Sequence, residues 1–123
     1  MSLTSSGGFA GRGHGSQAID SSGAITVGTM GGRTCSFDGT EDDVRRFAAL
    51  LAAAKPDAWK ASYIEPGQCC DLFEYQLTVD IAGRVTKTEW MDESALPADL
   101  AALADALTGG ESSLRVRYGS RCE

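Results

Sequence analysis

The stretch that decides the fold spans residues 73–90 and reads FEYQLTVDIAGRVTKTEW. Apolar and polar residues alternate in it without a break as far as Ile81, which is the pattern of a strand with one buried and one solvated face. Ala82-Gly83 then turns the chain, and the β-branched residues 84–90 return as the second arm of a hairpin. The stretch therefore predicts two antiparallel strands of a sheet.

A second hairpin and a helix are predicted upstream of this stretch. Two β-prone runs, residues 24–30 and 33–37, flank Gly31-Gly32, and a Gly pair between such runs is a hairpin signal. In residues 40–55, Thr40 is suited to cap a helix, and acidic residues fill the first turn, where the helix dipole favours them. The apolar stripe of this predicted helix consists of Val44, Phe47, Ala48, Leu51 and Ala54.

Downstream, the pattern predicts one more helix and one more strand. Residues 96–108 carry leucines at helical spacing, with Pro97 in the first turn and glycines after the end. Residues 114–118 alternate again and predict a last strand, with Arg115, Arg117 and Arg121 on its wet face. We therefore expect a single α+β domain over residues 1–123, with one antiparallel β-sheet of about four to five strands and two α-helices packed on one face.

Residues 1–23 are rich in glycine and serine, which occupy 12 of the 23 positions. Such a stretch is either a flexible leader or a set of tight backbone conformations that need glycine. Phe9 and Ile19 interrupt its polarity, so we expect residues 1–23 to be partly ordered.

The composition excludes two classes of partner. Acidic residues outnumber basic ones by 17 to 11, which argues against nucleic-acid binding, because that function needs a basic face. No apolar run approaches the ~18–20 residues that span a bilayer, so no membrane span is expected. The start, Met1-Ser2-Leu3-Thr4, shows no basic and apolar regions of a signal peptide, so an exported protein is expected to be represented here by its mature form.

The four cysteines predict an oxidising compartment. Cys35, Cys69, Cys70 and Cys122 match no zinc-binding spacing, and an even number of scattered cysteines is typical of structural disulfides. Adjacent cysteines rarely bond each other, so Cys69 and Cys70 are each expected to pair with Cys35 or Cys122, in an order that the sequence leaves open. The alternative is four reduced, buried thiols in a cytosolic protein. The disulfide interpretation predicts a secreted or periplasmic protein.

No pattern in the chain indicates catalysis. The single histidine, His14, lies in the Gly-rich stretch, and no nucleophile, phosphate-binding or metal-binding motif is present. The acidic residues 38–43 are explained by the helix start that they precede and enter. We therefore expect no catalytic residue, no metal and no cofactor, and a protein that binds rather than reacts.

The least generic segment is Ser5-Ser6-Gly7-Gly8-Phe9-Ala10-Gly11. It is either a mobile terminus with Phe9 docked on the core, or a presented loop. In a presented loop, glycines let the backbone enter a narrow cleft while one apolar side chain fills a pocket. The residues alone leave both alternatives open.

At this segment the chain resembles the emfourin family of small bacterial inhibitors of thermolysin-like (M4) metallopeptidases. The resemblance spans nearly the whole chain. It is carried by Ser6-Gly7-Gly8-Phe9-Ala10-Gly11, by an Asp-x-Phe-x-Tyr strand at Asp71, Phe73 and Tyr75, by a strand ending in Trp90, and by a Leu-Pro-x-x-Leu-x-x-Leu helix at Leu96, Pro97, Leu100 and Leu103.

The resemblance implies a protein partner, a bacterial metallopeptidase, which a monomer would inhibit by inserting Ser6, Gly7, Gly8, Phe9, Ala10 and Gly11 into the active-site cleft. Thermolysin-like enzymes favour a bulky apolar side chain beside the scissile bond, and Phe9 would supply one. The glycines would allow extended backbone pairing with the enzyme's edge strand. Two alternatives remain: a secreted cell-envelope binding module without inhibitory activity, and an enzyme of unrecognised type.

Overall fold

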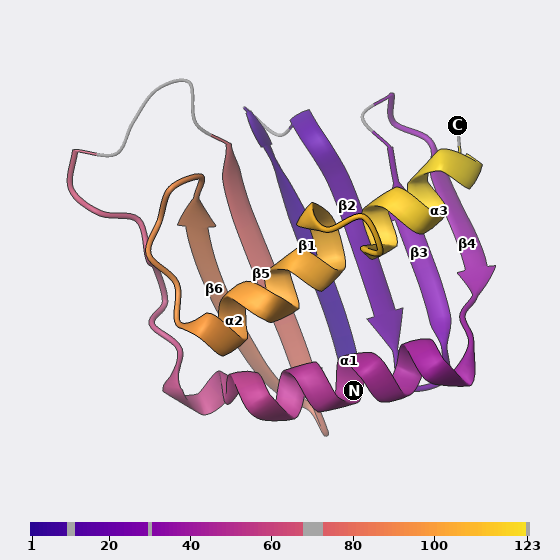
Figure 1. The fold of residues 1–123 in the computed structure, drawn as a ribbon, viewed down its shortest axis with the longest axis horizontal. Helices are drawn as coiled ribbons and strands as arrows, with labels where there is room; N and C mark the ends of the chain where they lie inside the picture. Colours follow the sequence, from indigo (N-terminus) through magenta and orange to yellow (C-terminus); the bar gives the residue numbers. More distant parts are fainter. Residues whose placement is uncertain (10–11, 30, 68–72, 123) are drawn as a thin grey trace.

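The computed structural model describes residues 1–9, 12–29, 31–67 and 73–122, which form an α+β fold on one antiparallel sheet (Figure 1). The strands are β1 (Ser2–Phe9), β2 (Arg12–Asp20), β3 (Ala24–Gly28), β4 (Thr34–Asp38), β5 (Glu74–Ile81) and β6 (Arg84–Met91). The helices are α1 (Glu41–Ala54), α2 (Ala98–Ala104) and α3 (Leu114–Cys122), with the short helical segments η1 (Pro56–Ala58) and η2 (Asp105–Gly109). The predicted class, α+β with a single antiparallel sheet, is confirmed.

The strands lie side by side in the order β4-β3-β2-β1-β5-β6, and every neighbouring pair is antiparallel. Both hairpins predicted from the sequence are present, as β5–β6 and β3–β4. Ala82 (φ 52°) and Gly83 (φ 85°) turn the chain between β5 and β6, and two positive φ angles are what a tight two-residue turn requires.

Residues 1–23 contribute two strands, β1 and β2, which occupy the centre of the sheet (Figure 1). The sheet therefore has six strands among the described residues, where about four to five were expected. The overlooked signal is weak but present: Leu3, Ser5, Gln17 and Ile19 are all at most 2% exposed and alternate with more exposed neighbours. The alternation is hard to recognise in the sequence because the buried position at Ser5 is occupied by a polar residue.

The core lies between the sheet and the helices, which all cross the same face in Figure 1. Burial of apolar area in such a cluster is the main favourable contribution to folding. The principal strand members are Leu3, Ile19, Ile25, Val27, Leu77 and Val79. The principal helix members are Phe47, Leu51, Leu100, Leu103, Leu107 and Leu114.

Helix α1 begins as the sequence predicts. The Thr40 hydroxyl accepts a hydrogen bond from the Asp43 N–H at 3.1 Å, and the Asp43 carboxylate accepts one from the Thr40 N–H at 3.2 Å. This reciprocal capping box satisfies two donors that a helix start otherwise leaves free. Phe47, Leu51 and Ala54 of the predicted stripe are buried, whereas Ala48 is exposed.

The predicted last strand is wrong, because residues 114–118 belong to helix α3. Its buried residues are Leu114, Tyr118 and Cys122, which are four positions apart. This spacing places them on one face of a helix, but it is also compatible with the two-residue period of a strand. Ser113 stabilises the first turn, since its hydroxyl accepts the Val116 N–H at 3.2 Å. The helix contacts β2, β3 and β4.

The cysteine pairing differs from the prediction. Cys35 of β4 is bonded to Cys122 at the end of α3, so neither is available to the adjacent pair. The prediction failed because it required all four cysteines to be bridged among themselves, whereas α3 packs Cys122 directly over β4. Cys69 and Cys70 lie outside the described residues.

Among the helices that the structure describes, none is both long enough and apolar enough to cross a membrane.

Candidate functional site

The segment singled out by the sequence lies at one end of the sheet. Ser6, Gly7, Gly8 and Phe9 are the last residues of β1, and β2 begins at Arg12. Ala10 and Gly11 join the two strands and lie outside the described residues. The segment is therefore the end of the β1–β2 hairpin, and in Figure 1 helix α1 crosses the sheet near the opposite end.

The first two residues of this segment, Ser6 and Gly7, are already paired on both sides. Ser6 lies opposite Ser16 of β2 and Gln76 of β5, and Gly7 lies opposite Gly15 and Tyr75. A strand in the middle of a sheet has no free edge to offer a partner. The expected backbone pairing of Gly7 with an enzyme strand is therefore wrong, because β2 and β5 already occupy both sides of Gly7.

Tyr75 lies directly over Gly7. A Cβ atom added to Gly7 would lie 2.5 Å from Cδ1 of the Tyr75 ring, closer than real Cβ contacts come. Only glycine permits this approach without a shift of the ring or the strand. The Gly-rich segment and the aromatic strand, which both carry the family resemblance, thus meet in space.

The Tyr75 side chain is held by two neighbours. Its hydroxyl donates a hydrogen bond of 2.9 Å to Asp92 Oδ1, and its ring stacks on that of Trp90, with centroids 5.7 Å apart and planes 15° from parallel. Burial raises the pKa of Tyr75 to about 12, together with the hydrogen bond and the negative charge of Asp92, against an opposing effect of Arg115. The hydroxyl therefore stays protonated and remains a donor at neutral pH.

A polar hollow of about 450 Å³ opens beside the hairpin end. Its lining includes Ser6, Ser16 and Gln76, which alternate along their strands with buried residues, so it opens on the face away from the helices. Gly28 also lines it, and a Cβ there would lie 2.6 Å from the Ser16 hydroxyl oxygen. Glycine, serine and threonine thus form most of this depression, and Arg33, Glu74 and Gln76 complete its lining.

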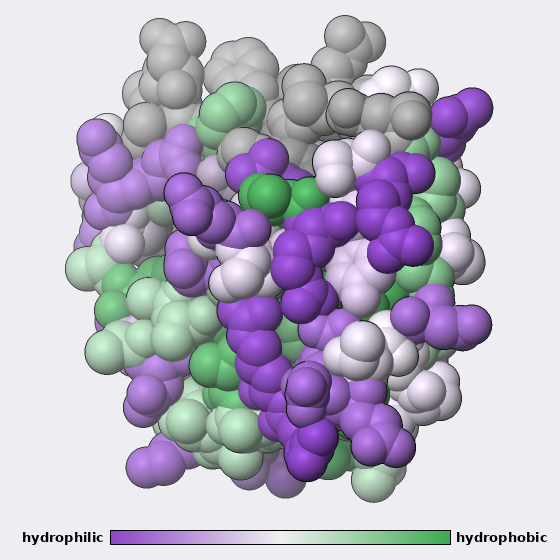
Figure 2. All heavy atoms as spheres, turned by 45° about the vertical axis from the view of Figure 1, so that its right-hand side comes forward, coloured by the Kyte–Doolittle hydropathy of each residue, from purple (hydrophilic) through white to green (hydrophobic). Residues whose placement is uncertain are grey.

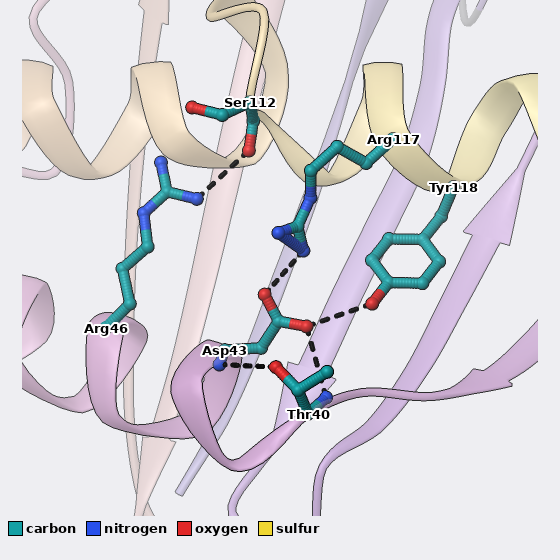
Figure 3. A network of polar contacts seen from close by, with 6 residues as sticks. All are labelled: Thr40, Asp43, Arg46, Ser112, Arg117 and Tyr118. Carbon is teal, nitrogen blue, oxygen red and sulfur yellow. Dashed lines mark hydrogen bonds and ion pairs between the residues drawn. The ribbon is translucent and has the colours of Figure 1, made fainter.

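A second polar cluster joins α1 to α3 (Figure 3). The carboxylate of Asp43, which is 3% exposed, forms an ion pair with Arg117 and accepts a hydrogen bond of 2.9 Å from the Tyr118 hydroxyl. Burial raises the pKa of Asp43, but the hydrogen bonds from Thr40 and Tyr118 and the charge of Arg117 outweigh it and lower the pKa below its ordinary value of 3.8. Each group is used in fastening two helices, so we assign the cluster a structural role.

The arginines near the carboxyl end are not the wet face of a strand. Arg115 donates from Nε to the Thr108 carbonyl at 2.6 Å, Arg117 pairs with Asp43, and the Arg121 guanidinium lies 4.7 Å from the Phe37 ring centroid. Figure 2 brings this side of the molecule forward and shows hydrophilic residues over much of it.

Sequence reasoning singled out the Gly-rich segment but predicted neither the strands that hold it nor the residues that pack against it. Asp92 belongs to no motif in the sequence, yet its carboxylate accepts hydrogen bonds from the Tyr75 hydroxyl at 2.9 Å and from the Phe73 N–H at 3.1 Å. Nothing local in the sequence connects Asp92 to Tyr75, because the contact depends on the β5–β6 register. In the part of the chain that the structure describes, no group of three or more His, Cys, Asp or Glu side chains is arranged to hold a metal ion.

Comparisons of the chain with protein-family models, with curated proteins and with solved structures give no match.

Proposed function

We propose that the protein inhibits thermolysin-like metallopeptidases by inserting the end of its β1–β2 hairpin into the active-site cleft. The observation that carries the proposal is the position of Ser6–Phe9: these residues end β1, which with β2 forms a hairpin whose strands both lie inside a six-stranded sheet. The resemblance to the emfourin family assigns this same segment to inhibition.

The sheet explains how a short segment would bind without large ordering costs. β1 is paired with both β2 and β5 from Ser2 to Gly7, so the strand that carries the hairpin end is fixed before any partner arrives. A binding segment held in its bound conformation loses little conformational entropy on association. We assign Phe9, the last residue of β1, to the apolar pocket beside the scissile bond.

We also propose that the protein acts as a monomer in a secreted or periplasmic location. The Cys35–Cys122 disulfide supports the location, because such bridges persist in oxidising compartments. It also fastens the carboxyl-terminal helix to the sheet, which would help an inhibitor to resist the peptidases that it meets.

The test is a titration of a thermolysin-like peptidase with the protein, following hydrolysis of a small peptide. We expect inhibition at micromolar protein, and we expect Phe9→Ala to weaken it at least tenfold while the melting temperature stays nearly constant. Val85→Ala is the matched control, because Val85 is 54% exposed and lies opposite Asp80, toward the far end of the sheet.

Two results would count against this function. The absence of inhibition across several such peptidases would leave the non-inhibitory binding module as the better account. A large fall in the melting temperature of Phe9→Ala would instead assign Phe9 to the core.

A further inference from the structure

We infer that Tyr75 is a positioning residue for the β1–β2 hairpin end, which it holds in place by packing its ring against Gly7. The inference rests on the proposed function of the hairpin end. It assigns to Tyr75 an effect on binding that is exerted through the backbone of β1, without contact with the partner.

The first support is the closeness of the contact. A Cβ atom at Gly7 would lie 2.5 Å from Cδ1 and 3.0 Å from Cε1 of Tyr75, so the ring fills the space where a side chain would otherwise stand. Gly7 is two residues before Phe9 and lies opposite Tyr75 in the sheet. Any movement of the ring is therefore transmitted to the backbone that leads into the hairpin end.

The second support is that the ring is itself constrained. Asp92 holds the hydroxyl at 2.9 Å, and Trp90, which is 6% exposed, stacks on the ring from the neighbouring strand. Asp92 is in turn fixed to Phe73, the residue before β5, because its carboxylate accepts the Phe73 N–H at 3.1 Å and its own N–H donates to the Phe73 carbonyl at 3.0 Å. The ring thus meets β1 as a rigid surface.

The third support is that loss of the Tyr75 ring should have a local effect, which a residue that only stabilises the core would not have. Tyr75 is only half-buried: it packs against the core from the hairpin end of the sheet, whereas Leu77, two residues along β5, is fully buried within the core. Loss of its ring should loosen residues 6–9 more than it loosens the strands around Leu77. Such local opening is measurable as amide hydrogen exchange that is faster than global unfolding allows.

The experiment is a double-mutant cycle of Gly7→Ala, Tyr75→Ala and the double variant. We expect each single variant to weaken peptidase inhibition at least tenfold. The new methyl group of Gly7→Ala clashes with the Tyr75 ring, and Tyr75→Ala removes that ring. Inhibition by the double variant should therefore be less than threefold weaker than inhibition by Tyr75→Ala alone. Independent effects would multiply instead, and that result would overturn the inference.

Two conservative variants form the control pair. Tyr75→Phe keeps the ring over Gly7 and should recover most of the inhibition lost in Tyr75→Ala. Tyr118→Phe removes a hydroxyl–carboxylate hydrogen bond of the same 2.9 Å length at the α1–α3 junction. It should leave both inhibition and the amide exchange of residues 6–9 unchanged, and an equal effect of Tyr118→Phe would show that general stability is responsible.

Amide exchange of residues 6–9, followed by NMR in the free protein, separates this inference from the proposed function. If the wild-type protein inhibits no peptidase but exchange at residues 6–9 follows the cycle, the proposed function fails and the positioning role stands. If the wild-type protein inhibits but neither exchange nor inhibition is coupled between Gly7 and Tyr75, the positioning role fails alone.

Discussion

At the scale of single residues, Gly15 carries the tightest constraint near the hairpin end. Its φ angle is +68°, and a Cβ atom there would lie 2.0 Å from the carbonyl oxygen of Gly28 on the next strand. An L-residue pays about 1–2 kcal/mol for left-handed backbone alone. We therefore expect Gly15→Ala to lower the free energy of unfolding by more than ~2 kcal/mol, because the clash with Gly28 adds to that cost.

Chemical denaturation of Gly15→Ala beside Gly83→Ala tests this expectation. Gly83 also has a positive φ, +85°, but nothing lies within 4 Å of its Cβ position. Gly83→Ala should therefore show the conformational cost without the clash, about 1–2 kcal/mol. Equal losses for the two variants would contradict the steric account of Gly15.

The residues of the candidate site show what a sequence can and cannot reveal. Phe9 stands out because an aromatic residue among glycines and serines is rare enough to notice. Tyr75 does not, because in a strand of alternating residues it reads as one more inward-facing position. The role of Tyr75 depends on the strand register that places it opposite Gly7, and on its hydrogen bond to Asp92, which follows β6. Neither contact can be predicted from the residues next to Tyr75 in the sequence.

At the scale of elements, the junction of α1 and α3 depends on the charge of Asp43. Because the folded state lowers the pKa of Asp43, the ionised carboxylate stabilises the fold fully above its ordinary pKa of 3.8. This contribution is lost as the pH falls through the lowered folded pKa. We expect Asp43→Asn to lower the free energy of unfolding by roughly 1.5–3 kcal/mol at pH 7, the range for hydrogen bonds to a charged group.

Urea denaturation from pH 7 down to the acid limit of the native state measures both effects. The difference in unfolding free energy between wild type and Asp43→Asn should be constant near neutral pH and should shrink below about pH 4. Asp20, whose pKa is lowered by hydrogen bonds from Ser22, titrates in both proteins and cancels in the difference. A difference that stays constant into acid would contradict the role assigned to the Asp43 charge.

The elements that sequence reasoning found are those with strong local signals. β5 and β6 alternate cleanly, and Thr40 with Asp43 forms a capping box that is legible in the sequence. β1 and β2 were not counted as strands because serine and glycine fill positions that apolar residues usually hold. The segment of α3 predicts a strand because Leu114, Val116 and Tyr118 alternate with arginines, whereas its helical pattern emerges only when Cys122 is included with Leu114 and Tyr118.

At the scale of the whole molecule, one covalent bond links the end of the chain to the edge of the sheet. Cys35 lies on β4, the edge strand, and Cys122 lies on the last turn of α3, at a sequence separation of 87. A bridge across so long a segment restricts the unfolded chain strongly, and bridges of this kind contribute about 2–4 kcal/mol. We expect Cys35→Ser combined with Cys122→Ser to lower the free energy of unfolding by that amount.

The location of the bridge also predicts which part of the molecule becomes less stable when the bridge is removed. α3 contacts β2, β3 and β4, whereas the hairpin end is supported by β5 through Tyr75. In the double serine variant, the amides of α3 should therefore exchange faster, while exchange at residues 6–9 should change only as far as global stability does. The melting temperature should fall, yet inhibition by the folded variant well below it should equal that of the wild-type protein. A variant as stable as the wild type would show that packing of Leu114 and Tyr118 alone holds α3, and a selective loss of inhibition would mean that the bridge shapes the hairpin end as well.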